Sequence, residues 1–300
     1  MRIDWLVVAL SVASAFAFSV STTLKKASAA QVPDARSSRA GGVTGFVAAT
    51  VRNPLWWAGI LADVIGLGLQ VLALHLGPLA VVQPLLVSGL LFALLLRHRP
   101  WWHISRRELV WAAALIGCLI GFLLLSGSIT GTRQLTAADR LPAVIAAAVG
   151  LGTASACLFL AHRGIPASTR AGLIGIAVGA VYAATAALIK ATTNVAAIHG
   201  LLAVLASWQL YTVLAVGALS LFLTQLAFQA GPLTASLPTM ATVDPLLSVA
   251  IGVLVYDEHL RRGPLDGTVL LALLLLLAAA VIQLSRLDAT ELPKPSPTPS

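Results

Sequence analysis

The chain has 300 residues, of which 58% are hydrophobic and 10% are charged, and its mean hydropathy is +0.93. Long unbroken apolar runs at this composition indicate an α-helical protein with several membrane spans, and they exclude a soluble globular domain or a β-barrel. The net charge of +8 comes from basic residues between the apolar runs. Membrane topology explains these residues, so nucleic acid is not an expected partner.

Nine apolar runs are long enough to cross a hydrocarbon layer of about 30 Å. They cover residues 4–24, 54–76, 78–97, 108–127, 141–161, 171–190, 208–230, 232–256 and 266–285. The first run has a signal-peptide alternative, but its length and the Lys25–Lys26 pair before the small-residue stretch argue against cleavage.

Three segments outside the nine runs have their own character. The basic segment 28–53 has amphipathic helix spacing over residues 43–50, which predicts that this part lies in the membrane interface. A second short apolar piece, 195–206, occupies the matching place before the seventh run. The proline-rich residues 287–300 are typical of a disordered tail.

The basic residues predict the orientation of the chain in the membrane. With nine crossings, 13 of the 19 Lys and Arg residues fall on one side and six on the other. Because the side richer in Lys and Arg is normally cytoplasmic, we expect the N-terminus outside and the C-terminus inside the cytoplasmic membrane.

The eighth run contains a carboxylate near the middle of the bilayer. Asp244 lies about 18 Å beyond Pro232 at helical rise, where an Asp costs roughly 2.5–3.5 kcal/mol on insertion scales. Pro245 removes a backbone donor and disfavours helical geometry at Asp244, so we expect a broken helix with free carbonyls here. Thr239 and Thr242 add hydroxyls. This combination is typical of a transporter site; the alternative is a proline kink with a protonated Asp bonded to a neighbouring helix.

Two parts of the chain repeat each other. Residues 72–84 (LALHLGPLAVVQP) and 226–238 (LAFQAGPLTASLP) agree at six of 13 positions. Residues 24–28 and 188–192 also correspond. Small residues recur every four positions in the first and sixth runs, a spacing that permits close helix packing: Ser11, Ala15, Ser19 and Thr23, and Gly175, Gly179, Ala183 and Ala187.

The repeat predicts the fold. It pairs spans 1–4 with spans 6–9, which are five crossings apart, so the two copies must point in opposite directions. We expect an all-α integral membrane protein with nine transmembrane helices, in which one linker helix joins two inverted four-helix repeats. The parts are a first repeat at 1–127, a linker at 128–169, a second repeat at 170–286 and a tail at 287–300. An alternative register pairs Gln83-Pro84 with Asp244-Pro245. Inverted repeats are typical of secondary transporters, whose site lies between the copies.

These features resemble the drug/metabolite transporter superfamily (EamA-like). The resemblance rests on the Lys-terminated first helix of each half and on the stretch AFQAGPLTASLPTMATVDPLLSVAIGVLVYDE. Two four-helix units around a linker helix are most similar to its nine-helix NIPA-type magnesium-transporter-like branch. The similarity covers about residues 1–286 and departs from ten-helix members, where a full helix stands in place of each short segment. It implies a transporter fold and does not carry over magnesium as the substrate.

Polar residues inside or at the ends of spans are the candidate functional residues. Two acids lie well inside spans, and if both face the interface between the halves they are expected to bind a cation or exchange protons. The candidate substrate- or ion-binding residues are Asp63, Asp244, Thr239, Thr242, Gln83, Gln70 and Tyr182.

A second group is expected to gate the protein or to support the first. Its members are Lys26, Lys190, His75, Gln225, Gln229 and Glu258. The alternatives are interfacial anchoring for the lysines and interhelical hydrogen bonds for the glutamines and the histidine. For Glu258 we favour an ion pair with Arg261 or Arg262.

The motif searches give no HExxH, Gly-x-Ser-x-Gly or P-loop, so we expect neither an enzyme nor a cofactor. The expected function is secondary transport of a small metabolite, drug-like or cationic solute by alternating access, with a proton as one candidate coupling ion. One alternative is a permease for Mg²⁺ or another divalent cation, because carboxylates and carbonyls are its preferred ligands. Another is a non-transporting membrane assembly or lipid-handling protein, whose basic loops hold anionic head groups.

Overall fold

The computed structural model describes residues 5–31, 52–97, 105–126, 140–161, 164–258 and 266–290, and this described part is almost entirely helical, with no strand. Nine segments of this described part are long and apolar enough to cross a membrane, which makes the chain a multi-pass membrane protein and confirms the predicted number of spans. The helices are α1 (Trp5–Gln31), α3 (Pro54–Leu76), α4 (Leu79–Leu86), α5 (Gly89–Arg97), α6 (Arg106–Ser126), α7 (Arg140–Leu160), α8 (Ala167–His199), α9 (Leu201–Leu205), α10 (Trp208–Ala230), α11 (Leu233–Leu254) and α12 (Asp266–Thr290).

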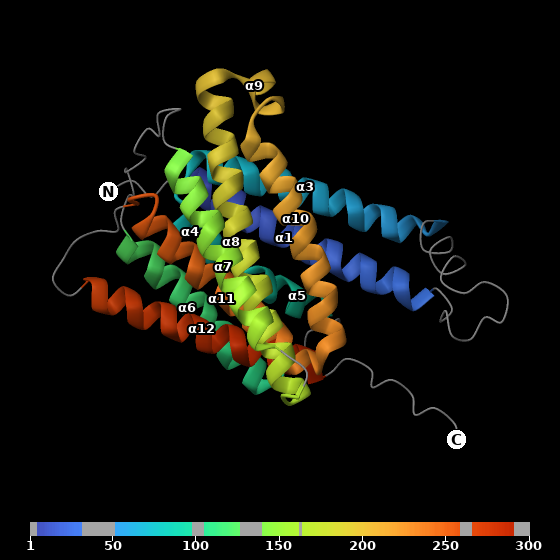
Figure 1. Cartoon of the computed structure of the whole chain (residues 1–300). Coiled ribbons are helices and arrows are strands. Elements are labelled where there is room, and N and C mark those ends of the chain that lie inside the picture. The colour runs from blue at the N-terminus through green and yellow to red at the C-terminus, as the bar shows by residue number, and fades with distance from the viewer. Residues whose placement is uncertain are drawn as a thin grey trace.

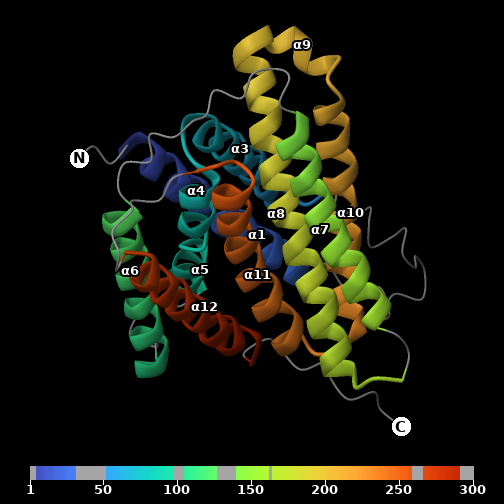
Figure 2. The same cartoon turned by 60° about the vertical axis from the view of Figure 1, so that its left-hand side comes forward.

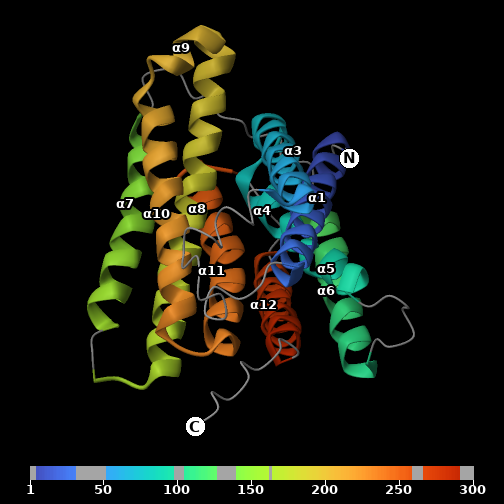
Figure 3. The same cartoon turned by 90° about the vertical axis from the view of Figure 1, so that its right-hand side faces the viewer.

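The helices form two groups that meet along α4, α8 and α11 (Figure 1). One group holds α7, α8, α10 and α11, and the other holds α1 and α3 to α6 (Figure 3). The last helix, α12, leaves the group that precedes it in the chain and lies beside α6 (Figure 2). Successive spans run in alternating directions, so that α1 descends in Figure 3 and α8 rises.

Small residues allow the closest helix contacts, as their spacing predicted. On α8, a Cβ added to Gly175 would lie 2.1 Å from Thr239 Oγ1, and one added to Gly179 would lie 2.8 Å from Val243 Cβ, so α11 can approach only because both residues are glycine. In the other group, Ser19 Oγ donates to the Gly89 carbonyl at 2.7 Å. These contacts hold α8 against α11 and α1 against α5.

The break in the helices occurs in the third span and not, as we expected, in the eighth. We expected a broken helix at Asp244-Pro245, but α11 continues from Leu233 to Leu254 through both of its prolines. The third span is the interrupted one, because α4 ends after Pro84 in a tight turn in which the Val87 N–H donates to the Pro84 carbonyl at 3.2 Å. A single proline kink is tolerated in a membrane helix when its neighbours hold it in place. In the third span the tight turn and Gly89, which begins α5, complete the break.

The sixth span is longer than predicted. Helix α8 runs for 33 residues to His199 and absorbs the start of the short apolar segment 195–206, because no glycine or proline follows Lys190 until Gly200. Gly200 ends it at a φ of 83°, and α9 then projects beyond the other helices with exposed leucines (Figure 1). Residues 43–50 of the expected interfacial segment and residues 291–300 of the expected tail lie outside the described part of the chain.

Candidate functional site

A cavity of about 450 Å³ lies where the two groups of helices meet. Helices α1, α4 and α5 and the turn between the last two form one wall, and α8 and α11 form the other. Most of its lining is apolar, with the polar residues Ser19, Thr22, Gln83, Tyr182 and Asp244 among it. A pocket of this size between helices is large enough for a small organic solute.

Gln83 and Asp244 face the cavity from opposite sides. Gln83 lies on α4 and its side chain is 3% exposed, yet its amide nitrogen Nε2 has no hydrogen-bond partner among the described residues. Asp244 lies on α11, and its Oδ1 accepts a hydrogen bond of 3.3 Å from Ser248 one turn later. Each of the two residues directly precedes a proline. The alternative register of the repeat, which pairs Gln83-Pro84 with Asp244-Pro245, therefore joins two residues that line the same cavity.

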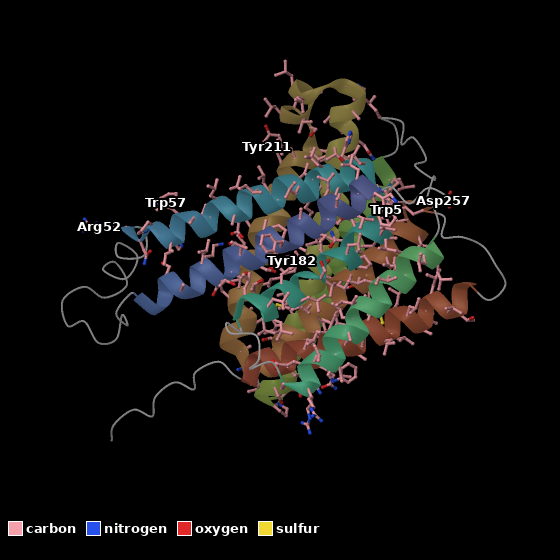
Figure 4. All side chains as sticks on the ribbon, turned by 180° about the vertical axis from the view of Figure 1, so that it is seen from behind. Trp5, Arg52, Trp57, Tyr182, Tyr211 and Asp257 are labelled. Atoms are coloured by element: carbon pink, nitrogen blue, oxygen red, sulfur yellow. The ribbon has the colours of Figure 1, made fainter. Side chains whose placement is uncertain are left out.

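Tyr182 completes the polar part of the lining. It projects from α8 near the middle of the bundle, between the end marked by Trp5 and Asp257 and the end marked by Trp57 (Figure 4). Its hydroxyl lies 3.0 Å from Thr224 Oγ1 on α10, which fixes the ring against the cavity. In the described residues Asp244 is the one carboxylate of the lining, and no Lys, Arg or His side chain lines the cavity.

Two predicted binding residues lie on the outer pair of helices instead. Asp63 on α3 forms an ion pair with Lys25 on α1, and both side chains remain about a third exposed, at 38% and 35%. Gln70, two turns further along α3, is also half-buried and outside the cavity. The structure therefore does not bring Asp63 together with Asp244. Sequence analysis selected Lys26 as a candidate, but the lysine that pairs with Asp63 is the preceding residue, Lys25. The sequence alone does not show that Lys25 and Asp63 are partners.

The two threonines of α11 also lie outside the cavity lining. Thr239 Oγ1 donates to the carbonyls of Ala235 and Ser236 on its own helix, at 3.0 and 2.9 Å. Thr242 is buried, and its hydroxyl has no partner within the described part of the chain. Both threonines are close to Asp244 along α11, as the sequence predicted. Because each residue turns the helix by about 100°, their side chains point in other directions than the side chain of Asp244.

A buried ion pair beyond the cavity, together with its backbone hydrogen bonds, joins the two groups of helices. Lys190 Nζ on α8 lies 2.5 Å from Glu258 Oε1, just after α11, and the two side chains are only 7% and 3% exposed. The carboxylate of Glu258 also accepts the first backbone N–H groups of α4, from Leu79 at 2.7 Å and Ala80 at 2.8 Å. Lys190 donates further to the Gly77 carbonyl at 3.2 Å. We call these five residues the Lys190–Glu258 cluster.

The local backbone explains how Glu258 reaches α4. Asp257 has a φ of 53°, a left-handed conformation that Asp tolerates better than most residues, and it reverses the chain after α11. Gly252 leaves room for the returning carboxylate, since a Cβ there would lie 2.3 Å from Glu258 Oε2. The negative charge then sits at the positive end of the α4 dipole, where it is stabilised. Glu258 thus pairs with Lys190. The ion pair with Arg261 or Arg262 that we favoured stays a prediction, because both arginines lie outside the described residues.

The remaining candidates of the second group do not meet at one site. His75 at the end of α3 and Gln225 on α10 are exposed on the outside of the bundle. The side chains of Lys26 and Gln229 lie outside the described part of the structure, although their backbones belong to α1 and α10.

Comparison with known proteins gives one similar chain. An uncharacterized protein of Corynebacterium glutamicum is 27% identical over 288 residues, which cover 95% of the present chain and 96% of the relative. No family model matches the chain, and no solved structure matches it. The similarity covers nearly the full length of both chains.

Proposed function

We propose that this protein is a secondary transporter of the cytoplasmic membrane that moves a small solute through the cavity by alternating access. The observation that carries the proposal is the cavity itself. It lies between two groups of helices and combines a carboxylate, an unpartnered buried amide and an apolar lining. Intramembrane carboxylates that face an internal cavity are usually functional, because their burial is costly.

The arrangement of the helices supports an inverted repeat. The pairs proposed to correspond are α1 with α8, α3 with α10, the α4–α5 span with α11, and α6 with α12. Within this scheme, α1 packs on α3 as α8 packs on α10, while α4 packs on α11 and α6 packs on α12. The corresponding helices α1 and α8 run in opposite vertical directions (Figure 3). A cavity bounded by the third span of each half is where such a scheme expects the solute.

We further propose that the Lys190–Glu258 cluster is the closed gate of the transporter. Gly77 and Ala80 precede the cavity-lining residue Gln83 on a descending span, and Glu258 follows the cavity-lining residues of the rising α11. The cluster therefore lies at one end of the cavity. With the N-terminus outside, this is the extracellular end. Opening the cavity to that side requires α4 to separate from Glu258 and Lys190.

The lining favours a solute transporter over the alternatives. A divalent cation is normally held by several oxygen ligands of its own site, often two or more carboxylates, whereas the cavity offers one carboxylate. No group of three His, Cys, Asp or Glu side chains that could hold a metal ion occurs among the described residues. A lipid-handling role is favoured by a cavity without polar lining, whereas five polar residues from four helices line this one.

The proposal is tested with purified protein in proteoliposomes that contain a pH-sensitive dye. A panel of amines, amino acids, sugars, nucleosides and divalent cations is added, and protein-dependent proton or solute flux is recorded. We expect flux with at least one organic class, which Asp244→Asn abolishes. Asp63→Asn, the same change at the acid outside the cavity, is the matched control and leaves flux unchanged. Flux that survives Asp244→Asn, or its absence for every class, refutes the proposed role of the cavity.

A further inference from the structure

The charges around the cavity select against anions. Asp244 supplies a carboxylate to the lining, and in the part of the chain that the structure describes no cationic side chain faces the same space. Lys190, a buried basic residue of the described part of the chain, is already paired with Glu258. An anionic solute would lose its hydration on entering the cavity and would then be repelled by the carboxylate of Asp244. A cationic solute gains a partner that water no longer screens, so the electrostatic preference is for a positive charge.

The amide of Gln83 adds a second requirement. Its Nε2 is a buried donor without a partner in the described residues, and a buried donor left unpaired carries a desolvation penalty. Gln83 lines the cavity although its Nε2 is itself buried, so a bound solute whose hydrogen-bond acceptor this nitrogen turns to meet removes that penalty. The acceptor has to be neutral, because an acidic group would meet Asp244 across the same space. Thr224 already holds the Tyr182 hydroxyl, which leaves Gln83 as the free donor of the lining.

The rest of the lining sets the character of the solute. Phe18, Leu86, Leu90 and Met240 contribute apolar surface from α1, α4, α5 and α11. A hydrated inorganic cation would leave this apolar surface in contact with the water molecules that it carries. An organic cation would instead cover the surface with its own carbon atoms, which is favourable. The volume of about 450 Å³ accommodates a molecule with one ring and a short polar chain.

We propose that the cavity binds an organic ammonium ion that carries a neutral hydrogen-bond acceptor close to its charged nitrogen. The ammonium group pairs with Asp244, the acceptor takes a hydrogen bond from Gln83, and the apolar part lies against the side chains of α1 and α5. The proposal rests on the proposed function, since it names the class of solute that the same cavity takes.

The test uses four probes on one scaffold and full-length protein in lipid nanodiscs, with binding measured by isothermal titration calorimetry. Phenylalaninamide has a cation and a neutral carbonyl, phenethylamine has the cation alone, N-acetylphenylalaninamide has the carbonyl alone, and phenylalanine has a cation and a carboxylate. The buffer is held at about pH 7, where most of the phenylalaninamide amino groups are still charged. We expect phenylalaninamide to bind most tightly, about tenfold better than phenethylamine and N-acetylphenylalaninamide and better still than phenylalanine.

Two variants assign the two contacts. Gln83→Leu should remove the advantage of phenylalaninamide over phenethylamine, and Asp244→Asn should remove its advantage over N-acetylphenylalaninamide. The matched controls, Gln225→Leu on the exposed face of α10 and Asp63→Asn on α3, should leave both ratios unchanged.

Three results overturn the proposal: phenylalanine or the uncharged probe binding as tightly as phenylalaninamide, unchanged ratios in the two variants, or no probe binding. A preference for phenylalanine together with flux in the proteoliposome assay refutes only the solute class. Binding in the expected order without any flux supports the solute class and refutes transport.

Discussion

Replacing Glu258 by Gln tests the Lys190–Glu258 cluster most directly. The change keeps the size of the side chain and one acceptor oxygen, but it leaves the buried Lys190 ammonium with the Gly77 carbonyl and the face of Tyr256, 5.8 Å away, as its remaining partners. Because the two side chains are only 7% and 3% exposed, solvent does not compensate the lost charge. Removing one partner of a buried pair typically costs about 3–5 kcal/mol. We expect Glu258→Gln to lower the free energy of unfolding by this amount.

The matched variants separate charge from shape. Lys190→Met leaves a carboxylate that still accepts two backbone N–H groups at the start of α4, so it should cost less than Glu258→Gln. The double variant Lys190→Met/Glu258→Gln leaves no unpaired charge and should recover to within about 2 kcal/mol of the native protein. The free energies are obtained from reversible unfolding in mixed micelles. The reasoning fails if Glu258→Gln costs less than about 1 kcal/mol, or if the double variant is no more stable than Glu258→Gln.

Three further predictions concern packing and the gate. Gly175→Ala should destabilise the protein by about 1–3 kcal/mol, because its Cβ would lie 2.1 Å from an α11 side chain, whereas Gly172→Ala on the same helix, with its nearest atoms at 4.0 Å, should be neutral or stabilising in thermal unfolding; equal effects would contradict the packing. A cysteine at the buried position Val82 should react faster with an impermeant maleimide added outside when Glu258→Gln is also present; an unchanged rate would contradict the gate. Tyr256→Phe should cost about 1 kcal/mol, since its hydroxyl donates to an α8 carbonyl at 2.8 Å, and no loss of stability would show that this bond is dispensable.

The spans could be predicted because each depends on its own composition. The bounds predicted for α3 and α10 agree with the structure at both ends, where Asn53 and Ser207 cap the first turns. The end of α8 was wrong by nine residues, since the polar residues after Lys190 look like a loop but continue the helix to Gly200. Polarity marks where a helix leaves an apolar layer, whereas α8 itself stops at Gly200, whose φ of 83° most other residues avoid.

The candidate site was predicted in part. Asp244, Gln83 and Tyr182 were chosen because polar groups inside spans are rare, and all three face one cavity. Asp63 was chosen on the same ground, yet a lysine one helix away pairs with it. Depth in the membrane follows from position along a span, but the direction of a side chain depends on which helices become neighbours.

The contacts of Glu258 lay beyond sequence reasoning for a related reason. Its partners Leu79 and Ala80 precede it by 179 and 178 residues, and they bind through backbone N–H groups that carry no side-chain signature. The repeated Gly-Pro-Leu turn at the start of α4 was visible. Nothing in it shows that one copy accepts a carboxylate from the other half of the chain.

The short helix α4 has a mechanical consequence. It is eight residues long, with the Lys190–Glu258 cluster at its first turn and the break before α5 at its end. Gln83 lies three residues after Ala80, so about one helical turn separates the amide that faces the cavity from the N–H groups held by Glu258. We expect so short a helix between two breaks in the backbone to move as a rigid body. In the proposed transporter, a solute that binds Gln83 would therefore also displace the start of α4 and weaken the hydrogen bonds that Leu79 and Ala80 donate to Glu258.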